Sequence, residues 1–462
     1  IMDLSILMKN TNKVDRTAGT PKNSHRRVLQ LAIPIILANL TTPILGAVDT
    51  AVMGHLASPS YLAAVSIGAI IIQFIFWGFG FLRMGTTGLT AQAFGINDKV
   101  ELQMNFLRPA LFAVIMGFIL WILQIPIINF ALYLFEASHT VETLASNYFE
   151  IRIWSAPAVL INYCLIGWFI GIQKTKITLL LHAWMNIINI ILDLVFVIGF
   201  EYGIVGVAIA TVIAEVSTTM IGIFLFRREI RNLRCKISIL DLLNLSKIKK
   251  LLENNLNIFI RTFCLIFAFA YFTSVAAKFG STILAVNAVL FQFIHFLSFG
   301  LDGFAQTAET LVGSALSAKN RIAYKLAVKT VTQWSIIIGF LYSIIYYFLG
   351  PILIDLLTDL PEVRSLSKEF LIWMIFFPIV AVWPYLLDGI FIGAMRSTDM
   401  RNGMLFSLAI FLGSINFLVE NYGYNGSWVA LYLFMLSRGI TLMIKYPQIN
   451  KNLKVVPISN TD

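Results

Sequence analysis

The sequence is poor in charged residues and in cysteine. Asp, Glu, Lys and Arg together make up 13% of its 462 residues, whereas 58% are hydrophobic and the mean hydropathy is +0.82. A soluble globular protein of this size needs more polar side chains to cover its surface. The composition therefore excludes a soluble globule and predicts an all-α membrane protein whose chain crosses the bilayer several times.

The three cysteines, Cys164, Cys235 and Cys264, lack the spacing of metal ligands, and two of them lie in apolar runs. A thiol in such a run behaves as a small hydrophobic group, so we expect neither a disulfide nor a metal site. The sequence also lacks a nucleotide-binding loop and a nucleophilic triad. These absences argue against an enzyme and against a cofactor. Without a nucleotide-binding loop, any transport by this chain would draw its energy from an ion gradient rather than from ATP.

The polar N-terminus, through about Arg27, lacks the apolar core and the cleavage site of a secretory signal. We therefore expect the first spanning helix to serve as the insertion signal. The net charge of +10 does not indicate a nucleic-acid partner, because Lys and Arg lie between apolar runs rather than along one helix face. Their placement is typical of loops that set membrane topology.

Apolar runs of about 20 residues predict twelve transmembrane helices, divided into two sets of six by one long polar interval. The expected helices are 28–54, 61–83, 104–134, 142–172, 177–199, 204–226, 253–278, 283–305, 326–357, 365–394, 402–420 and 426–446. The expected domains are a cytoplasmic tail (1–27), a first lobe (28–226), a cytoplasmic linker (227–252), a second lobe (253–446) and another cytoplasmic tail (447–462).

Lys and Arg are concentrated in every second predicted loop. The loops at 55–60, 135–142 and 200–203 contain none, and the exceptions are Lys278 and a mixed-charge loop around Arg364 and Lys368. By the positive-inside rule both termini are cytoplasmic. The expected location is the bacterial plasma (inner) membrane, which the chain crosses many times.

The two halves of the chain repeat one another. Three pairs of short motifs recur at separations of 220 to 222 residues: Leu62-Ala63 with Leu284-Ala285, Ile170–Thr175 with Ile392–Ser397, and Tyr202–Gly206 with Tyr422–Gly426. A nearly constant offset argues for duplication of a six-helix unit. We therefore expect two pseudo-symmetric six-helix lobes, related by an axis along the membrane normal.

Asp49 is a carboxylate inside the apolar run PILGAVDTAVMGH, Pro43–His55. An aspartate near the centre of a spanning helix raises the cost of membrane insertion by about 2.5–3.5 kcal/mol. Such a residue is usually functional, and the alternative is a polar contact that fixes helix packing. At the repeat offset Asp49 corresponds to Tyr271, and Asp193 falls near residues 413–415, so cation chemistry is expected in the first lobe.

The fifth predicted helix carries Asn186, Asn189 and Asp193 at spacings that place them on one face, and Thr211 follows in the sixth. At a rise of 1.5 Å per residue, Asp49, Asn189, Asp193 and Thr211 all lie roughly 7 to 15 Å below the outer helix ends. They are therefore expected to share one pocket, with Asn186 as a possible addition. Two carboxylates in such a pocket can hold a proton or, with Asn and Thr oxygens, Na⁺, and the sequence leaves this choice open.

Other ionisable residues fall inside the predicted helices. Arg83 and Asp302 lie in helices that are repeat partners, and we expect them to form an ion pair across the cytoplasmic mouth when the cleft opens outward. Local pairing, or extension of each side chain to the membrane interface, is the alternative. Glu309 and Asp388 are expected to be interfacial, and Glu215 is a weaker candidate for the cation pocket.

Four stretches carry a resemblance to a known family: PILGAVDTAVMGHL, FLRMGTTGLTAQAFG, NIILDLVFVIGFEYGIVGVAIATVIAE and LDGFAQTAETLVGSAL. Together they resemble the multidrug and toxic compound extrusion (MATE) family, specifically its DinF-like branch, and the similarity extends from about Arg27 to Lys445. The VDTAVMGHL and LDGFAQTAE segments are fairly specific to that branch.

The resemblance implies an efflux antiporter with two six-helix lobes around a V-shaped cleft. Such a protein exports organic compounds, often cationic or amphipathic, by alternating access in exchange for H⁺ or Na⁺. Its partners would be small-molecule substrates and membrane lipids, and a monomer is expected.

The family's first-lobe cation site corresponds here to Asp49, Asn189, Asp193 and Thr211, all four of which match the motif. Pro34 matches a first-helix proline implicated in helix bending. From the residue alone, Pro34 implies only that the helix lacks one backbone hydrogen bond.

Three other functions fit the sequence less well. A lipid-linked precursor flippase of the same broader superfamily would need a more cationic cavity, whereas most Lys and Arg here fall in predicted loops. A major-facilitator carrier would have a glycine-aspartate-arginine signature where this chain has GINDKVELQ. A membrane scaffold would leave the paired carboxylates within the membrane unexplained.

Overall fold

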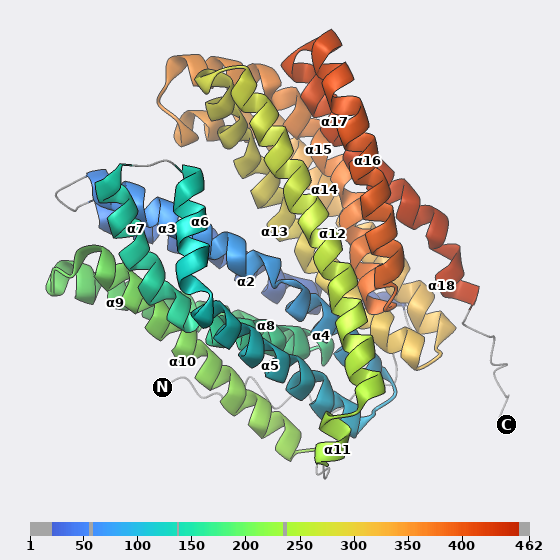
Figure 1. The fold of residues 1–462 in the computed structure, drawn as a ribbon. Coiled ribbons are helices and arrows are strands. Elements are labelled where there is room, and N and C mark those ends of the chain that lie inside the picture. Colours follow the sequence, from blue (N-terminus) through green and yellow to red (C-terminus); the bar gives the residue numbers. More distant parts are fainter. Residues whose placement is uncertain (1–20, 55–58, 136–137, 234–237, 452–462) are drawn as a thin grey trace, which may run out of the picture.

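The computed structural model describes residues 21–54, 59–135, 138–233 and 238–451 (Figure 1). The side chains of residues 21–23, 42–54, 59, 60, 62, 450 and 451 lie outside this description. Every regular element in the described ranges is a helix, which confirms the predicted all-α class.

The first half of the chain forms one bundle of helices. Its elements are α2 (Pro21–Gly54), α3 (Pro59–Gly78), α4 (Phe81–Gly95), α5 (Lys99–Ile122), α6 (Gln124–Phe135), α7 (His139–Arg152), the 3₁₀ turn η1 (Ile153–Ser155), α8 (Ala156–Gly171), α9 (Thr175–Asp193), the π-helix η2 (Leu194–Gly199) and α10 (Gly203–Arg231).

The second half forms another bundle after the short connecting helix α11 (Ile239–Leu242). Its elements are α12 (Leu245–Lys278), α13 (Ser281–Ser317), α14 (Arg321–Leu357), α15 (Pro361–Gly393), α16 (Ser397–Tyr422), α17 (Tyr424–Lys445) and the short α18 (Pro447–Lys451). Both ends of the predicted linker, 227–252, are thus helical.

The number of membrane spans agrees with the sequence. Eleven helical stretches of the described chain are long and apolar enough to cross a membrane. The 34-residue α2 supplies the first span, so the structure fits the predicted arrangement of twelve helices in two lobes. Large apolar side chains such as Phe130, Phe348 and Ile352 are exposed on the outside, as contact with lipid requires.

Two predicted spans end too early. The second was expected to stop at Arg83 and the eighth at residue 305, but α4 continues to Gly95 and α13 to Ser317. These extensions are rich in Gly, Thr, Ser and Gln, which lowers their hydropathy to that of a loop. Thr86 and Thr87 in α4 are nevertheless buried, because α4 packs both against α8 of its own lobe and against α13 of the second lobe.

Other predicted spans are interrupted. The second divides between Gly78 and Phe81 into α3 and α4, and the third divides at Leu123 into α5 and α6. The fourth contains the 3₁₀ turn η1 just before Pro157, which lies in the first turn of α8. Glycine is a weak helix former and proline cannot donate a backbone hydrogen bond, so the first and last of these breaks follow from local sequence.

The duplication is visible in the backbone. Helix ends recur 222 residues apart at Gly95 and Ser317, and at Gly171 and Gly393. Residues with positive φ recur after helices at the same offset: Asn97 and Lys319, Gln173 and Met395, and Glu201 and Gly423. A left-handed residue just after a helix is a common way to end it. Both lobes therefore turn their chains in the same manner, as the sequence repeat predicted.

The two lobes meet at one end of the molecule and diverge toward the other (Figure 1). Helices α2 and α4 of the first lobe pack against α12, α13, α14 and α15 of the second. Glycine allows the close approach, since a Cβ on Gly88 would lie 2.7 Å from the carbonyl oxygen of Ile392. We call the end formed by Gly95, Gly171, Ser317 and Gly393 the closed end, and the opposite end the open end.

Helix α2 belongs to both lobes. Val28 and Ala32 join an apolar cluster with Phe304 of α13 and Phe391 of α15 in the second lobe. Beyond this segment α2 packs against α9 of the first lobe. Pro34 is buried and lies close to the point where α2 changes its packing partner.

Candidate functional site

A cluster of buried polar side chains lies on α9 of the first lobe. Asn186, Asn189 and Asp193 are buried on one face of this otherwise apolar helix, as their spacing predicted. The regular α-helix ends at Asp193, where the π-helix η2 begins. A wider π-turn inside a helix is frequent at functional sites, because it displaces side chains and backbone groups from regular packing.

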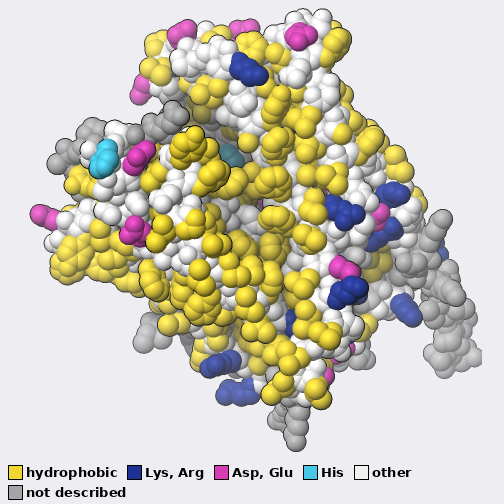
Figure 2. Space-filling model, in the orientation of Figure 1, with side chains coloured by type: hydrophobic (Ala, Val, Ile, Leu, Met, Phe, Trp, Pro, Cys, Tyr) yellow, Lys and Arg dark blue, Asp and Glu magenta, His cyan; other side chains and the backbone are white. Residues whose placement is uncertain are grey.

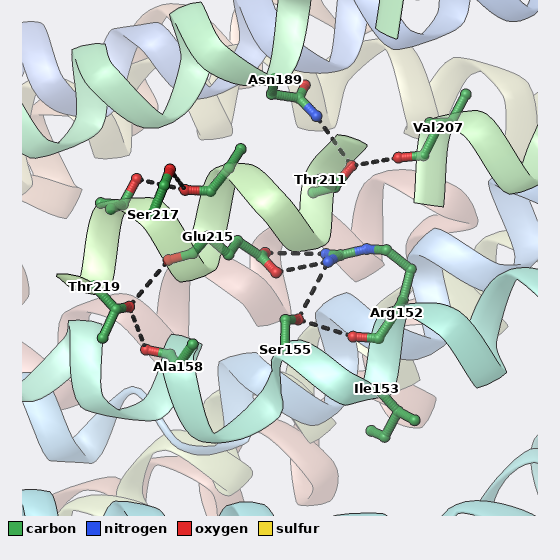
Figure 3. Close-up of polar contacts among 12 residues, drawn as sticks. Arg152, Ile153, Ser155, Ala158, Asn189, Val207, Thr211, Glu215, Ser217 and Thr219 are labelled. Carbon is green, nitrogen blue, oxygen red and sulfur yellow. Dashed lines mark hydrogen bonds and ion pairs between the residues drawn. The ribbon is translucent and has the colours of Figure 1, made fainter. Parts of the chain in front are cut away.

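Asn189 and Thr211 are in direct contact (Figure 3). The Asn189 Nδ2 atom donates a hydrogen bond of 3.0 Å to Thr211 Oγ1, which in turn donates one of 2.9 Å to the Val207 carbonyl oxygen. This chain of bonds fixes the orientation of the amide. The Asn189 Oδ1 atom is buried and finds no hydrogen-bond donor among the described residues. A buried carbonyl oxygen in this situation can accept a proton donor or coordinate a cation.

Asn186 connects α9 to α2. Its Nδ2 atom donates a hydrogen bond of 3.2 Å to the carbonyl oxygen of Thr41. Nearer the closed end, Arg27 of α2 donates to the side chain of Gln173, just before α9. These contacts show that α2 and α9 run side by side in the same direction and in register.

The register extends to the two predicted carboxylates. Residue 49 lies eight positions beyond Thr41 in α2, and Asp193 lies seven positions beyond Asn186 in α9. At a rise of about 1.5 Å per residue, both positions reach the same depth. The side chain of Asp49 itself lies outside the described residues, so its contacts stay a prediction.

Glu215 is held in an ion pair with Arg152 and not with the polar side chains of α9. It lies one turn after Thr211 on α10, and Arg152 Nη1 and Nη2 contact its two carboxylate oxygens at 2.6 and 3.1 Å (Figure 3). Arg152 also donates to Ser155 Oγ at 3.3 Å. Glu215, the weaker candidate for the cation pocket, is therefore already neutralised by Arg152.

Arg152 is the residue that sequence reasoning missed. It lies inside the predicted fourth span, and in the structure both it and Glu215 are buried. An isolated arginine within an apolar span needs a buried acidic partner, so its presence was a usable signal. With Asp49, Glu215 and Asp193 in three different helices, however, the sequence could not identify which acid that partner is.

The second lobe has a different buried cluster. Asp388 of α15 accepts hydrogen bonds from Arg438 of α17, at 2.9 Å, and from Arg261 of α12, both at the same carboxylate oxygen. The Arg438 guanidinium also lies 5.6 Å from the centre of the Phe434 ring. Two guanidinium groups from neighbouring helices thus neutralise Asp388 inside the lobe, near the end of α15 where the sequence placed it.

Arg83 forms an ion pair with a different acid from the one predicted. Its Nη1 atom lies 3.4 Å from Glu309 Oε2, and Glu309 is only 2% exposed. Asp302, the expected partner, lies two turns earlier on the same face of α13 and attracts Arg83 electrostatically without direct contact. The prediction failed because α4 does not end at Arg83 but continues to Gly95. Arg83 therefore lies within the interface between the lobes and not at the end of a span.

Comparisons of the sequence give consistent relatives. The MatE family model matches residues 34–195 and 258–418, one match in each lobe. DNA damage-inducible protein F of Escherichia coli is 39% identical over 420 residues, covering 91% of this chain and 91% of that protein. A probable multidrug resistance protein NorM of Bacillus cereus is 24% identical over 444 residues, covering 93% and 96%.

Comparisons of the structure give the same fold. A multidrug resistance MATE family transporter of the MOP superfamily, in an outward-facing conformation, superimposes with a TM-score of 0.84 at 19% identity and covers 94% of this chain and 97% of that chain. A MOP superfamily transporter from Pyrococcus furiosus gives a TM-score of 0.83 at 18% identity, with the same coverage.

Proposed function

Because the chain belongs to the MATE family of multidrug efflux transporters, we propose that it is a secondary active exporter driven by the inward movement of H⁺ or Na⁺. Its substrates are organic compounds, often cationic or amphipathic. Members of this family are transporters rather than enzymes. The lobes would alternate between states open to either side of the membrane.

The proposed coupling site consists of Asp49, Asn189, Asp193 and Thr211, with Asn186 fixing α2 against α9. The observation that carries the proposal is the buried Oδ1 atom of Asn189, one turn from Asp193 and without a donor among the described residues. The matching register of α2 and α9 supports it by bringing positions 49 and 193 to one depth. Glu215 is excluded from the site because Arg152 already neutralises it.

The closed end is proposed to face the cytoplasm. Figure 2 supports this orientation, since Lys and Arg gather toward the lower right of that face, and Asp and Glu toward the upper and left rims. Cytoplasmic segments carry an excess of Lys and Arg. In this orientation both termini are cytoplasmic, and the described conformation is open to the outside of a bacterial inner membrane.

The flippase is a weaker alternative. A lipid-linked precursor with a phosphate headgroup would require unneutralised cations in the central cavity. The buried guanidinium groups of the second lobe, Arg261 and Arg438, instead share Asp388. The exporter is therefore the function that we propose.

The test is transport of a fluorescent organic cation in proteoliposomes, with H⁺ and Na⁺ gradients imposed separately. We expect Asp49→Asn and Asp193→Asn to abolish gradient-driven transport for whichever ion drives the wild type. Asp355→Asn is the matched control, because Asp355 is a partly exposed carboxylate paired with Lys368 at the end of α14. Gradient-driven transport at the wild-type rate in both pocket variants would reject the coupling site.

A further inference from the structure

Six charged groups form a network where the lobes meet. The cations are Arg83, Arg261 and Arg438, and the anions are Asp302, Glu309 and Asp388. Three direct contacts hold it together: Arg83 with Glu309, and Asp388 with each of the other two arginines. Asp302 interacts electrostatically with Arg83 and Arg261. The formal charges of the six groups are therefore balanced, three positive and three negative.

The balance depends on one residue of the first lobe. Arg83 lies on α4, whereas the other five groups lie on α12, α13, α15 and α17 of the second lobe. Glu309 is almost fully buried, and its ion-pair partner, Arg83, comes from α4. Its charge is thus matched only while α4 stays packed against α13.

Opening the closed end would break this balance. Alternating access requires α4 to move away from α13, and Arg83 would leave with the first lobe. The second lobe would then keep three carboxylates and two guanidinium groups, with Glu309 unpaired. An uncompensated carboxylate in a low-dielectric interior is strongly unfavourable, so another cation has to replace Arg83.

We infer that Glu309 and Asp302 form a second acidic site, which binds the cationic group of the exported compound when the closed end opens and which Arg83 fills when it closes. This inference rests on the proposed function. It assigns substrate recognition to the second lobe and leaves ion coupling in the first.

The geometry favours an organic cation over a small inorganic one. Asp302 and Glu309 lie seven residues apart on α13, so they share one face and are separated by about 10 Å along it. The group that they attract in the described conformation is a guanidinium, which is broad, delocalised and weakly hydrated. Tyr385 of α15 lies near Asp302 and adds an aromatic ring to the same region.

Because Arg83 and the substrate cation use the same acids, they compete. The closed end can then shut fully only after the substrate has left Glu309. A tethered competitor of this kind would expel the cation toward the open cleft and prevent its return.

The inference is tested by equilibrium binding of tetraphenylphosphonium to the purified full-length protein, without any gradient. We expect Arg83→Gln to bind tetraphenylphosphonium about tenfold more tightly than the wild type, because the competing cation is gone. Glu309→Gln and the double variant Arg83→Gln/Glu309→Gln should each bind it about tenfold more weakly than Arg83→Gln does. Arg83→Lys should stay near the wild type. Glu362→Gln, an exposed acid in the first turn of α15, is the matched control.

Neutral triphenylphosphine oxide separates charge recognition from apolar binding, and its affinity should be the same in all variants. Affinities for tetraphenylphosphonium within twofold of one another in the wild type, Arg83→Gln and Glu309→Gln would overturn the inference. That result would also indicate that a proton, not the substrate, replaces Arg83. Since no gradient is involved, failure here is distinguishable from failure of the coupling site, which the Asp49→Asn and Asp193→Asn transport assay reports.

Discussion

At the scale of single residues, the buried polar groups in the described part of the chain divide into those that have a partner and those that do not. Glu215 is neutralised by Arg152, and Asp388 by two arginines. Asn189 instead presents a buried oxygen without a donor among the described residues. A buried charge with a partner stabilises the fold, whereas a buried oxygen without a donor can bind a cation. The partners of a buried polar group therefore distinguish a structural role from a functional one better than its burial does.

The Arg152–Glu215 pair is predicted to be structural. Replacing Arg152 by Met leaves a buried carboxylate unpaired, and we expect a loss of about 3–5 kcal/mol in the free energy of unfolding. Thermal unfolding of the detergent-solubilised protein measures this loss. The double variant Arg152→Met/Glu215→Met should recover most of it. Equal stability of the single variant and the wild type would show that the pair contributes little.

Thr211 is predicted to orient the Asn189 amide. Thr211→Val removes the hydroxyl that accepts the Asn189 Nδ2 hydrogen bond, so the amide can rotate and its oxygen loses its fixed direction. We expect the half-saturating concentration of the driving ion to rise about tenfold in transport assays, given the usual cost of an unsatisfied buried group. Thr211→Ser keeps the hydroxyl and should behave like the wild type. An unchanged ion dependence in Thr211→Val would remove Thr211 from the site.

Several site residues could be predicted from sequence and others could not. The face shared by Asn186, Asn189 and Asp193 follows from helical spacing alone. Partners such as Arg152 for Glu215, or Glu309 for Arg83, depend on which helices pack together, and no local pattern encodes that. The predicted pair of Arg83 with Asp302 identified the correct helix but the wrong turn.

At the scale of helices, hydropathy located the spans but not their ends. The hydropathy of the last turns of α4 and α13 is that of a loop, because Gly, Thr and Ser are weakly hydrophobic. These turns nevertheless form the contact between the lobes. Small residues are suited to such contacts because they let backbones approach closely. The breaks beside Gly78 and Pro157 were encoded locally, whereas the π-helix after Asp193 was not.

The glycine contact at the closed end is predicted to control the conformational equilibrium. A Cβ on Gly88 would lie 2.7 Å from the Ile392 carbonyl oxygen, so Gly88→Ala should push α4 away from α15. We expect faster labelling of a cysteine introduced at Gln92 by a maleimide reagent. Gly413→Ala is the control, because no atom lies within 4 Å of its added Cβ. Identical labelling rates in both variants would contradict the role of this contact.

At the scale of the whole molecule, a duplicated backbone carries two different chemistries. The helix ends and the positive-φ residues repeat at 222 residues, so the lobes share one scaffold. The first lobe has the proposed coupling site at its α2–α9 contact, whereas the second has Tyr271 at the position equivalent to Asp49 and arginines around Asp388. This asymmetry allows ion and substrate to occupy separate lobes of one transporter.

The orientation of the molecule makes a labelling prediction. Single cysteines at Asn320, near the closed end, and at Ser281, near the open end, lie at exposed positions. In intact cells, with the three native cysteines replaced, a membrane-impermeant maleimide should label the cysteine at Ser281 and not that at Asn320. The reverse pattern would place both termini outside the cytoplasm.

The central claim is that the first-lobe pocket holds the driving ion and releases it when substrate is exchanged. Ion release on addition of tetraphenylphosphonium to weakly buffered, purified protein tests it most directly, with a pH dye for H⁺ and a Na⁺ electrode for Na⁺. We predict release of one of the two ions by the wild type and by Asp355→Asn, and none by Asp193→Asn. Release from Asp193→Asn equal to that from the wild type would contradict the claim.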